Sequence, residues 1–272
     1  MSSSDLPSAW ENPVRKALAE GRPVIAVTIT TPSVEVAARA AGLGFDLLWI
    51  EMEHSPITLE TLRAMVLACR GLPALPFARV PVNELWTAKR VLDAGVYGVI
   101  FPFTGTPELA AQAAAACRYP PRGRRGCGPS LAMLNWPEPE RYYDSADENV
   151  MVVAVIEEAR AVENIEAIAA VEGIDVLFIG TADLSFSLGL RGKQDDPRHR
   201  EAVERVLEAA RRHGKIAGRP ARDARQLQQY LEQGFLFFQA TTDLNLMADG
   251  ARQLLDPLGK FTAVAPRRTI YG

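Results

Sequence analysis

The sequence is poor in cysteine and in long apolar segments. Its three cysteines, Cys69, Cys117 and Cys127, show no CxxC spacing. An odd number of cysteines without a regular framework favours a reduced, cytoplasmic protein over a disulfide-stabilised secreted one. No apolar run approaches the roughly 20 residues of a membrane-spanning helix. The first residues, MSSSDLPSAWENP, lack the basic and apolar regions of a signal peptide. We therefore expect a cytoplasmic protein with no membrane partner.

An excess of charge of either sign is also missing. The chain carries 30 basic and 33 acidic residues, a formal net charge of −3. No basic excess indicates nucleic acid, so we expect no nucleic-acid partner. With 272 residues, 48% of them hydrophobic, the chain is long enough for one large domain.

Short apolar segments alternate with segments of helical periodicity along the whole chain. The segments predicted as strands are residues 24–29, 45–50, 75–79, 98–101, 150–156, 176–179, 215–217 and 235–240. The segments predicted as helices are residues 14–20, 34–41, 58–69, 84–93, 107–116, 139–143, 159–172, 197–212, 223–233 and 244–258. Eight such repeats predict an α/β fold, a (β/α)₈ (TIM) barrel.

We expect residues 1–272 to form a single domain, with a short lead at about 1–13 and a tail at about 259–272. The alternative is an open doubly wound sheet. However, no GxGxxG follows the first predicted strand, which removes the main reason to propose dinucleotide binding.

Two predicted strands, the fifth and the sixth, are each followed by a carboxylate. Residues 150–156 lead into Glu157, and residues 176–179 lead into Gly180, Thr181, Ala182 and Asp183. Ligands of parallel α/β proteins bind at the carboxyl ends of the strands. Two carboxylates there could hold a hard divalent cation. The alternative is that Glu157 caps a helix and Asp183 caps a turn; for the pair we favour the metal.

The predicted second and third strands end in further candidates. The second strand ends in Glu51, and Glu53 and His54 follow in the loop. A carboxylate beside the imidazole would make His54 a general acid/base near neutral pH. Arg79 ends the third strand, where a guanidinium suits recognition of a carboxylate or phosphate. The alternatives are a surface histidine and an arginine paired with an acid on a neighbouring strand. For Asp93, which ends a helix, a structural role is favoured on sequence alone.

Three other groups of basic residues give weaker evidence for a role in the site. His199 and His213 fall on a polar helix face, which predicts a solvated position. Arginines of the loop at residues 118–130 could form an anion gate or a subunit contact, or could simply be solvated. No lysine is predicted on a strand facing the interior, which argues against a Schiff-base aldolase.

Four stretches together resemble the HpcH/HpaI aldolase family, the class II, metal-dependent pyruvate aldolases of the phosphoenolpyruvate/pyruvate barrel superfamily. They are FDLLWIEMEHSPIT, RVPVNELWTAKRVLDAGVYGVIFP, ACRYPPRGRRGCG and AVEGIDVLFIGTADLSFSLG. The similarity runs from about residue 19 to residue 255. The resemblance implies that Glu157 and Asp183 hold Mg²⁺, Mn²⁺ or Co²⁺. It also implies a homo-oligomer, a hexamer or trimer, with the C-terminal helix exchanged between subunits.

The resemblance implies roles for the remaining candidates as well. It makes His54 the acid/base, places Arg79 against the keto acid, and has Asp93 assist near the site. Backbone amides of the segment Gly180, Thr181 and Ala182 would receive the substrate carboxylate. The family has Asp at the position of Glu51.

The family pattern also differs from this sequence around the four core residues. The family usually has Gln at Val155, Pro at Thr181 and Gly near Thr241. The resemblance implies reversible cleavage of a 4-hydroxy-2-oxo acid to pyruvate and an aldehyde. Two alternatives stay open: another metal-enolate enzyme of the superfamily (an acyl-CoA lyase, decarboxylase or cyclase), or a noncatalytic barrel that binds a small acid.

Overall fold

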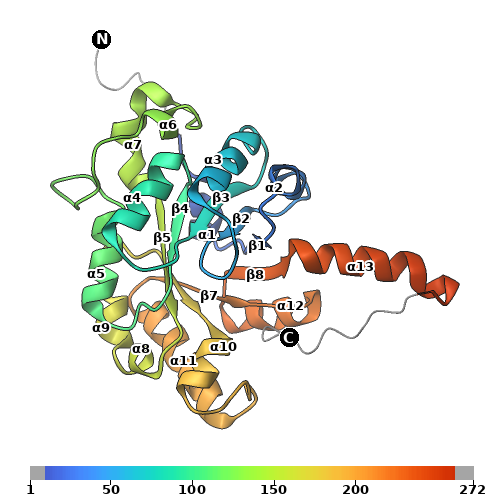
Figure 1. Cartoon of the computed structure of the whole chain (residues 1–272). Helices are drawn as coiled ribbons and strands as arrows, with labels where there is room; N and C mark the ends of the chain where they lie inside the picture. Colours follow the sequence, from blue (N-terminus) through green and yellow to red (C-terminus); the bar gives the residue numbers. More distant parts are fainter. Residues whose placement is uncertain (1–9, 261–272) are drawn as a thin grey trace.

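Eight parallel strands form a closed barrel in the computed structural model, which describes residues 10–260 (Figure 1). Each strand pairs with its sequence neighbours, and β8 closes the barrel on β1. The strands are β1 (Val24–Ile29), β2 (Leu47–Glu51), β3 (Leu75–Arg79), β4 (Gly98–Phe101), β5 (Met151–Ile156), β6 (Val176–Ile179), β7 (Ile216–Pro220) and β8 (Phe237–Thr242). The predicted (β/α)₈ fold is confirmed. The predicted lead and tail lie largely outside the described residues.

Helices surround the barrel on its outer face (Figure 1). They are α1 (Pro13–Ala19), α2 (Val34–Ala41), α3 (Leu59–Ala68), α4 (Leu85–Ala94), α5 (Pro107–Ala116), α6 (Ser130–Met133), α7 (Tyr142–Asn149), α8 (Ala159–Glu163), α9 (Ile165–Ala169), α10 (Thr181–Ser187), α11 (Pro197–Arg212), α12 (Ala224–Gln233) and α13 (Asp243–Leu255), with 3₁₀ turns η1 (Pro139–Arg141) and η2 (Asp256–Leu258). Among residues 10–260, no helix combines the length and the apolar character needed to cross a membrane.

Aromatic side chains fill the barrel. The Trp49 ring lies 4.8 Å from that of Phe178, which in turn lies 6.2 Å from Phe237. Gly98 on β4 is needed for this packing, because a Cβ there would overlap the Phe77 ring. Strands β1, β2 and β5 are thus buried on both faces, as their mostly apolar sequences predict.

Side-chain caps fix several helix starts. Thr58, predicted as a cap, accepts a hydrogen bond from the Thr61 N–H at 3.3 Å. Thr106 does the same for the Leu109 N–H at the start of α5, where proline occupies the first helical position. These caps orient the loops that connect the carboxyl ends of the strands to the next helices.

Several elements differ from the prediction, among them α6, which was not predicted, and α7, which covers Tyr142–Asn149 rather than residues 139–143. The helix predicted over residues 159–172 is divided into α8 and α9 at Asn164, whose side chain donates to the Gly105 carbonyl at 3.0 Å. The short helix α10, which contains Asp183, was not predicted. The seventh strand extends to Pro220 although it contains Arg219, because that guanidinium stacks 3.6 Å from the Tyr230 ring centroid.

The C-terminal helix α13 projects away from the barrel (Figure 1). Asp243 is its one buried residue, and its carboxylate accepts hydrogen bonds from the backbone N–H groups of Thr30 and Thr31 at 3.0 and 2.8 Å. The start of α13 is therefore fixed to the segment that follows β1, while its apolar residues Leu244, Met247 and Leu254 are exposed.

Candidate active site

Glu157 follows β5 directly and is almost completely buried. Its carboxylate accepts a hydrogen bond from the Phe103 N–H at 2.7 Å. Burial, with a smaller contribution from the nearby charges of Glu53 and Asp183, raises the pKa of Glu157 to about 7, although the Phe103 bond and Arg79 oppose the shift. Mutually repelling carboxylates in a partly buried space are the arrangement that a cation would stabilise.

Asp183 lies in the first turn of α10, immediately after β6. The turn approaches Glu157 closely, since a Cβ on Gly180 would lie 2.7 Å from both the Cβ and the Oε2 of Glu157. A glycine at position 180 is therefore required for this approach. The structure brings Glu157 and Asp183 to neighbouring strand ends, as predicted.

Glu51 and Arg79 form an ion pair across β2 and β3, where they are also in register. Arg79 Nε lies 2.6 Å from Glu51 Oε2. The other oxygen, Oε1, accepts the backbone N–H groups of Glu53 at 2.8 Å and His54 at 3.0 Å. Trp49 Nε1 donates to Oε2 at 3.3 Å, which is the fourth hydrogen bond of the Glu51 carboxylate. Glu51 therefore holds Arg79 and the backbone of the histidine loop.

The acid beside the His54 imidazole is Glu53. Glu53 Oε2 lies 3.6 Å from His54 Nε2 and 3.2 Å from Arg79 Nη1. Burial raises the pKa of Glu53, and Arg79 and His54 act against that shift. On sequence alone, Glu53 is only an acidic neighbour of His54 and has no predicted role of its own.

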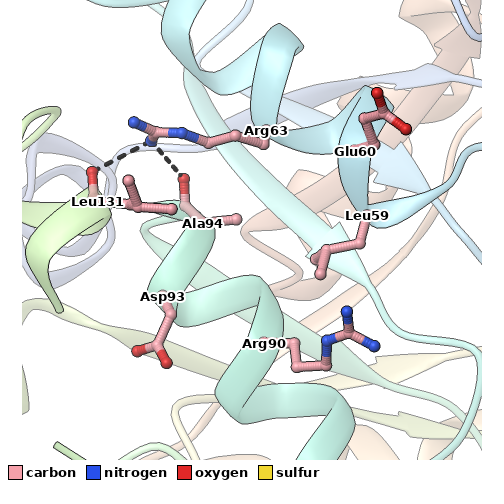
Figure 2. Close-up of a pocket in the computed structure, with 7 residues that line it drawn as sticks. All are labelled: Leu59, Glu60, Arg63, Arg90, Asp93, Ala94 and Leu131. Carbon is pink, nitrogen blue, oxygen red and sulfur yellow. Dashed lines mark hydrogen bonds between the residues drawn. The ribbon is translucent and has the colours of Figure 1, made fainter. Parts of the chain in front are cut away.

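Asp93 is not part of this group within one chain. It lies in the last turn of α4, and so at the end of the barrel opposite the carboxyl ends of the strands. Together with Arg90 it lines a pocket of about 400 Å³ to which α3 and α6 also contribute. Figure 2 shows these residues. Its carboxylate lies 3.8 Å from Arg125, and burial raises its pKa. This placement fits the structural role favoured on sequence alone.

The loop arginines lie at the same far end, since their loop follows the C-terminus of α5 and leads into α6. Arg125 is fully buried, donates to the Tyr142 hydroxyl at 2.5 Å and stacks on Tyr119. Arg118 is also buried and lies 3.8 Å from Asp175. These two side chains are structural and do not form an anion gate.

His199 was predicted to be solvated, and this prediction is wrong. The side chain is buried, and its Nε2 lies 3.0 Å from the Thr181 carbonyl oxygen. The polar sequence of α11 concealed this position because a single buried imidazole hardly changes the helix pattern. His213, at the end of the same helix, pairs with Glu166 at 3.0 Å.

The residues present fit a divalent cation that retains water and substrate ligands. No group of three or more His, Cys, Asp or Glu side chains in residues 10–260 forms a complete protein cage. Glu157 and Asp183 supply two carboxylates instead. Mg²⁺-type ions are commonly held by one or two carboxylates, with waters or substrate oxygens completing the shell.

Known proteins share this architecture. Residues 29–250 match the family model described as HpcH/HpaI aldolase/citrate lyase. The 5-keto-4-deoxy-D-glucarate aldolase of Klebsiella pneumoniae is 35% identical over 226 residues, 83% of this chain and 88% of that protein.

Two solved structures are also similar. An HpcH/HpaI aldolase/citrate lyase family protein from Burkholderia cenocepacia has a TM-score of 0.84 and 33% identity, over 91% of this chain and 99% of that one. The citrate synthase SbnG has a TM-score of 0.81 and 28% identity, over 90% and 96%. These likenesses confirm the resemblance and the prediction of an enzyme with aldolase-type lyase activity. The chain belongs to the HpcH/HpaI aldolase/citrate lyase family.

Proposed function

We propose that this enzyme is a divalent-metal-dependent aldolase that reversibly cleaves a 4-hydroxy-2-oxo acid to pyruvate and an aldehyde. The observation that carries the proposal is the convergence at one end of the barrel of two carboxylates, Glu157 and Asp183, with the buried guanidinium of Arg79. The electrostatic influence of Asp183 and Arg79 on Glu157 supports their proximity. The curated relative, named an aldolase for a keto-deoxy sugar acid, points to the same substrate class.

Glu157 and Asp183 would hold Mg²⁺, Mn²⁺ or Co²⁺, and the bound ion supplies a Lewis acid for the keto oxygen. Arg79 would stabilise negative charge that develops on that oxygen when the C3–C4 bond breaks. Glu51 keeps the guanidinium in place for this role. Backbone amides of Gly180, Thr181 and Ala182 would receive the substrate carboxylate.

His54 would take the proton from the C4 hydroxyl during cleavage. Glu53 is the carboxylate placed to orient its ring, at 3.6 Å from Nε2. Glu51 acts on the same loop through the backbone N–H of His54 rather than through the imidazole. Asp93 is too far along α4 to assist within one chain, so the assistance implied by the resemblance would have to come from a neighbouring copy.

Two alternatives, a noncatalytic barrel that binds a small acid and an acyl-CoA lyase, are less well supported than the aldolase. The basic residues suited to a coenzyme A phosphate are those of residues 118–125, and this loop lies at the end of the barrel opposite the proposed site. A carbon–carbon bond-forming reaction of the superfamily is the second candidate, because the chain is 28% identical to a protein named a citrate synthase.

We also propose a cytoplasmic homo-oligomer in which α13 packs on another barrel. Four apolar side chains of α13 and the adjoining turn η2 are about half exposed or more. They are Leu244, Met247, Leu254 and Leu258. A helix with one buried residue gains stability chiefly by covering such side chains. A hexamer or trimer satisfies this requirement, and light scattering of the purified protein measures the number of subunits.

Pyruvate release from a panel of 4-hydroxy-2-oxo acids, with and without added Mn²⁺, tests the activity. We expect Glu157→Gln and Asp183→Asn to abolish metal-dependent release. The exposed Glu163→Gln in α8 is the matched control and should retain activity. Turnover that continues undiminished in a chelator would exclude the mechanism.

A further inference from the structure

His199 is a buried imidazole on a helix that is otherwise largely polar. It lies in the first turn of α11, and its side chain is 2% exposed. Burial lowers the pKa of His199, and the nearby charge of Arg219 adds to the effect, while the bond to the Thr181 backbone opposes it. A neutral ring bonded to a carbonyl oxygen must donate from Nε2, which fixes the tautomer.

The acceptor of that bond is in the segment that carries Asp183. Thr181 is the first residue of α10, and its carbonyl oxygen lies 3.0 Å from His199 Nε2. The residue before Thr181 is bonded to β5: the Gly180 N–H donates to the carbonyl of Ile156, the residue before Glu157, at 3.1 Å. The turn is therefore held from β5 on one side and from α11 on the other.

A second connection supports the same turn. The Ser185 hydroxyl donates to the Ala182 carbonyl at 2.6 Å and accepts the Gly192 N–H at 2.9 Å. It ties α10 to the loop that precedes α11 but leaves the Thr181 carbonyl untouched. His199 is thus the side chain that secures the first residue of α10 from the helix layer.

We propose that His199 is a positioning residue that holds the turn of residues 180–183 so that Asp183 and the turn's backbone amides lie correctly against Glu157. This inference rests on the proposed function, because it concerns the same metal and keto-acid site. The His199 ring bonds to the Thr181 backbone and, within residues 10–260, forms no hydrogen bond or ion pair with Glu157 or Asp183. Its effect is transmitted through the Thr181 carbonyl.

The test compares His199→Ala with His199→Gln, whose amide N–H can still donate. Mn²⁺ affinity by calorimetry and KM and kcat for pyruvate release are measured on each. We expect His199→Ala to weaken Mn²⁺ binding and raise KM by about tenfold each, the effect of one lost buried hydrogen bond. His199→Gln should recover much of both. His213→Ala, on the same helix, should leave both unchanged.

Hydrogen exchange of residues 181–188 in the metal-free protein gives a readout independent of activity. His199→Ala should accelerate exchange there, and His199→Gln should restore protection. A His199→Ala variant with wild-type Mn²⁺ affinity and KM, changed only in melting temperature, would overturn the proposal. If the wild-type chain released no pyruvate, the proposed function would fail; unchanged local exchange would then still refute the positioning role, and accelerated exchange would support it.

Discussion

Arg79 and Glu51 form a buried ion pair at the carboxyl end of the barrel, with Nε and Oε2 separated by 2.6 Å. The side chains are 11% and 3% exposed. Glu51 also accepts two backbone N–H groups of the loop that leads to His54. This pair joins the structural core of β2 and β3 to the proposed chemistry.

Removal of Glu51 should therefore be costly. We expect Glu51→Ala to lower the free energy of unfolding by about 3–5 kcal/mol, because the buried Arg79 guanidinium loses its shortest ion pair and two backbone N–H groups lose their acceptor. Urea denaturation measures this loss. Glu20→Ala, which breaks the exposed Arg22 pair, is the control and should cost at most about 1 kcal/mol. Equal stabilities for the two variants would contradict the role of the buried pair.

Metal binding should depend on pH through Glu157. Its pKa is raised to about 7, and the metal binds the deprotonated carboxylate. Protons therefore compete below pH 7, so Mn²⁺ affinity should rise with pH up to about 7 and then level off. Calorimetric titration between pH 5.5 and 8 measures the trend. An affinity that stays constant from pH 5.5 to 7 would show that Glu157 does not titrate in this range.

The close approach of Gly180 to Glu157 makes a further prediction. In Gly180→Ala the new methyl group would lie 2.7 Å from Glu157 Cβ, so Glu157 or the turn must move. We expect Mn²⁺ affinity to fall at least tenfold while the barrel stays folded. Gly42→Ala is the matched control, because its Cβ meets nothing closer than 3.7 Å. Normal Mn²⁺ binding by Gly180→Ala would mean that the site tolerates the displacement.

Phe103 carries backbone strain at the site. Its φ is +49°, a left-handed conformation that is unusual for an aromatic residue, and its N–H bonds Glu157. Phe103→Gly and Phe103→Ala both delete the ring and keep the N–H. We expect the glycine variant to be more stable by roughly 0.5–1 kcal/mol, since relief of the left-handed conformation outweighs its greater unfolded-state entropy. Thermal unfolding distinguishes them; a more stable alanine variant would contradict the argument.

The barrel follows from local sequence patterns. Runs such as residues 150–156 can be stable only when buried on both faces, and the alternating helical segments supply the cover. Because the carboxyl ends of all eight strands meet at one end of a barrel, the order of segments also placed Glu51, Arg79, Glu157 and Asp183 together. Their positions needed no knowledge of individual contacts.

Contacts between segments distant in the sequence decided which of the polar side chains are buried and which of them pair. Whether Glu51 or Glu53 lies beside the His54 imidazole depends on how a loop bends over β3. Burial of His199 depends on the packing of α11 against the barrel, where its ring reaches the Thr181 carbonyl, and that of Arg125 depends on two tyrosines from separate segments. The sequence by itself determined which strand ends carry charge. The tertiary structure decided which of those charges are desolvated and paired, because burial and partner distance arise only when the segments pack together.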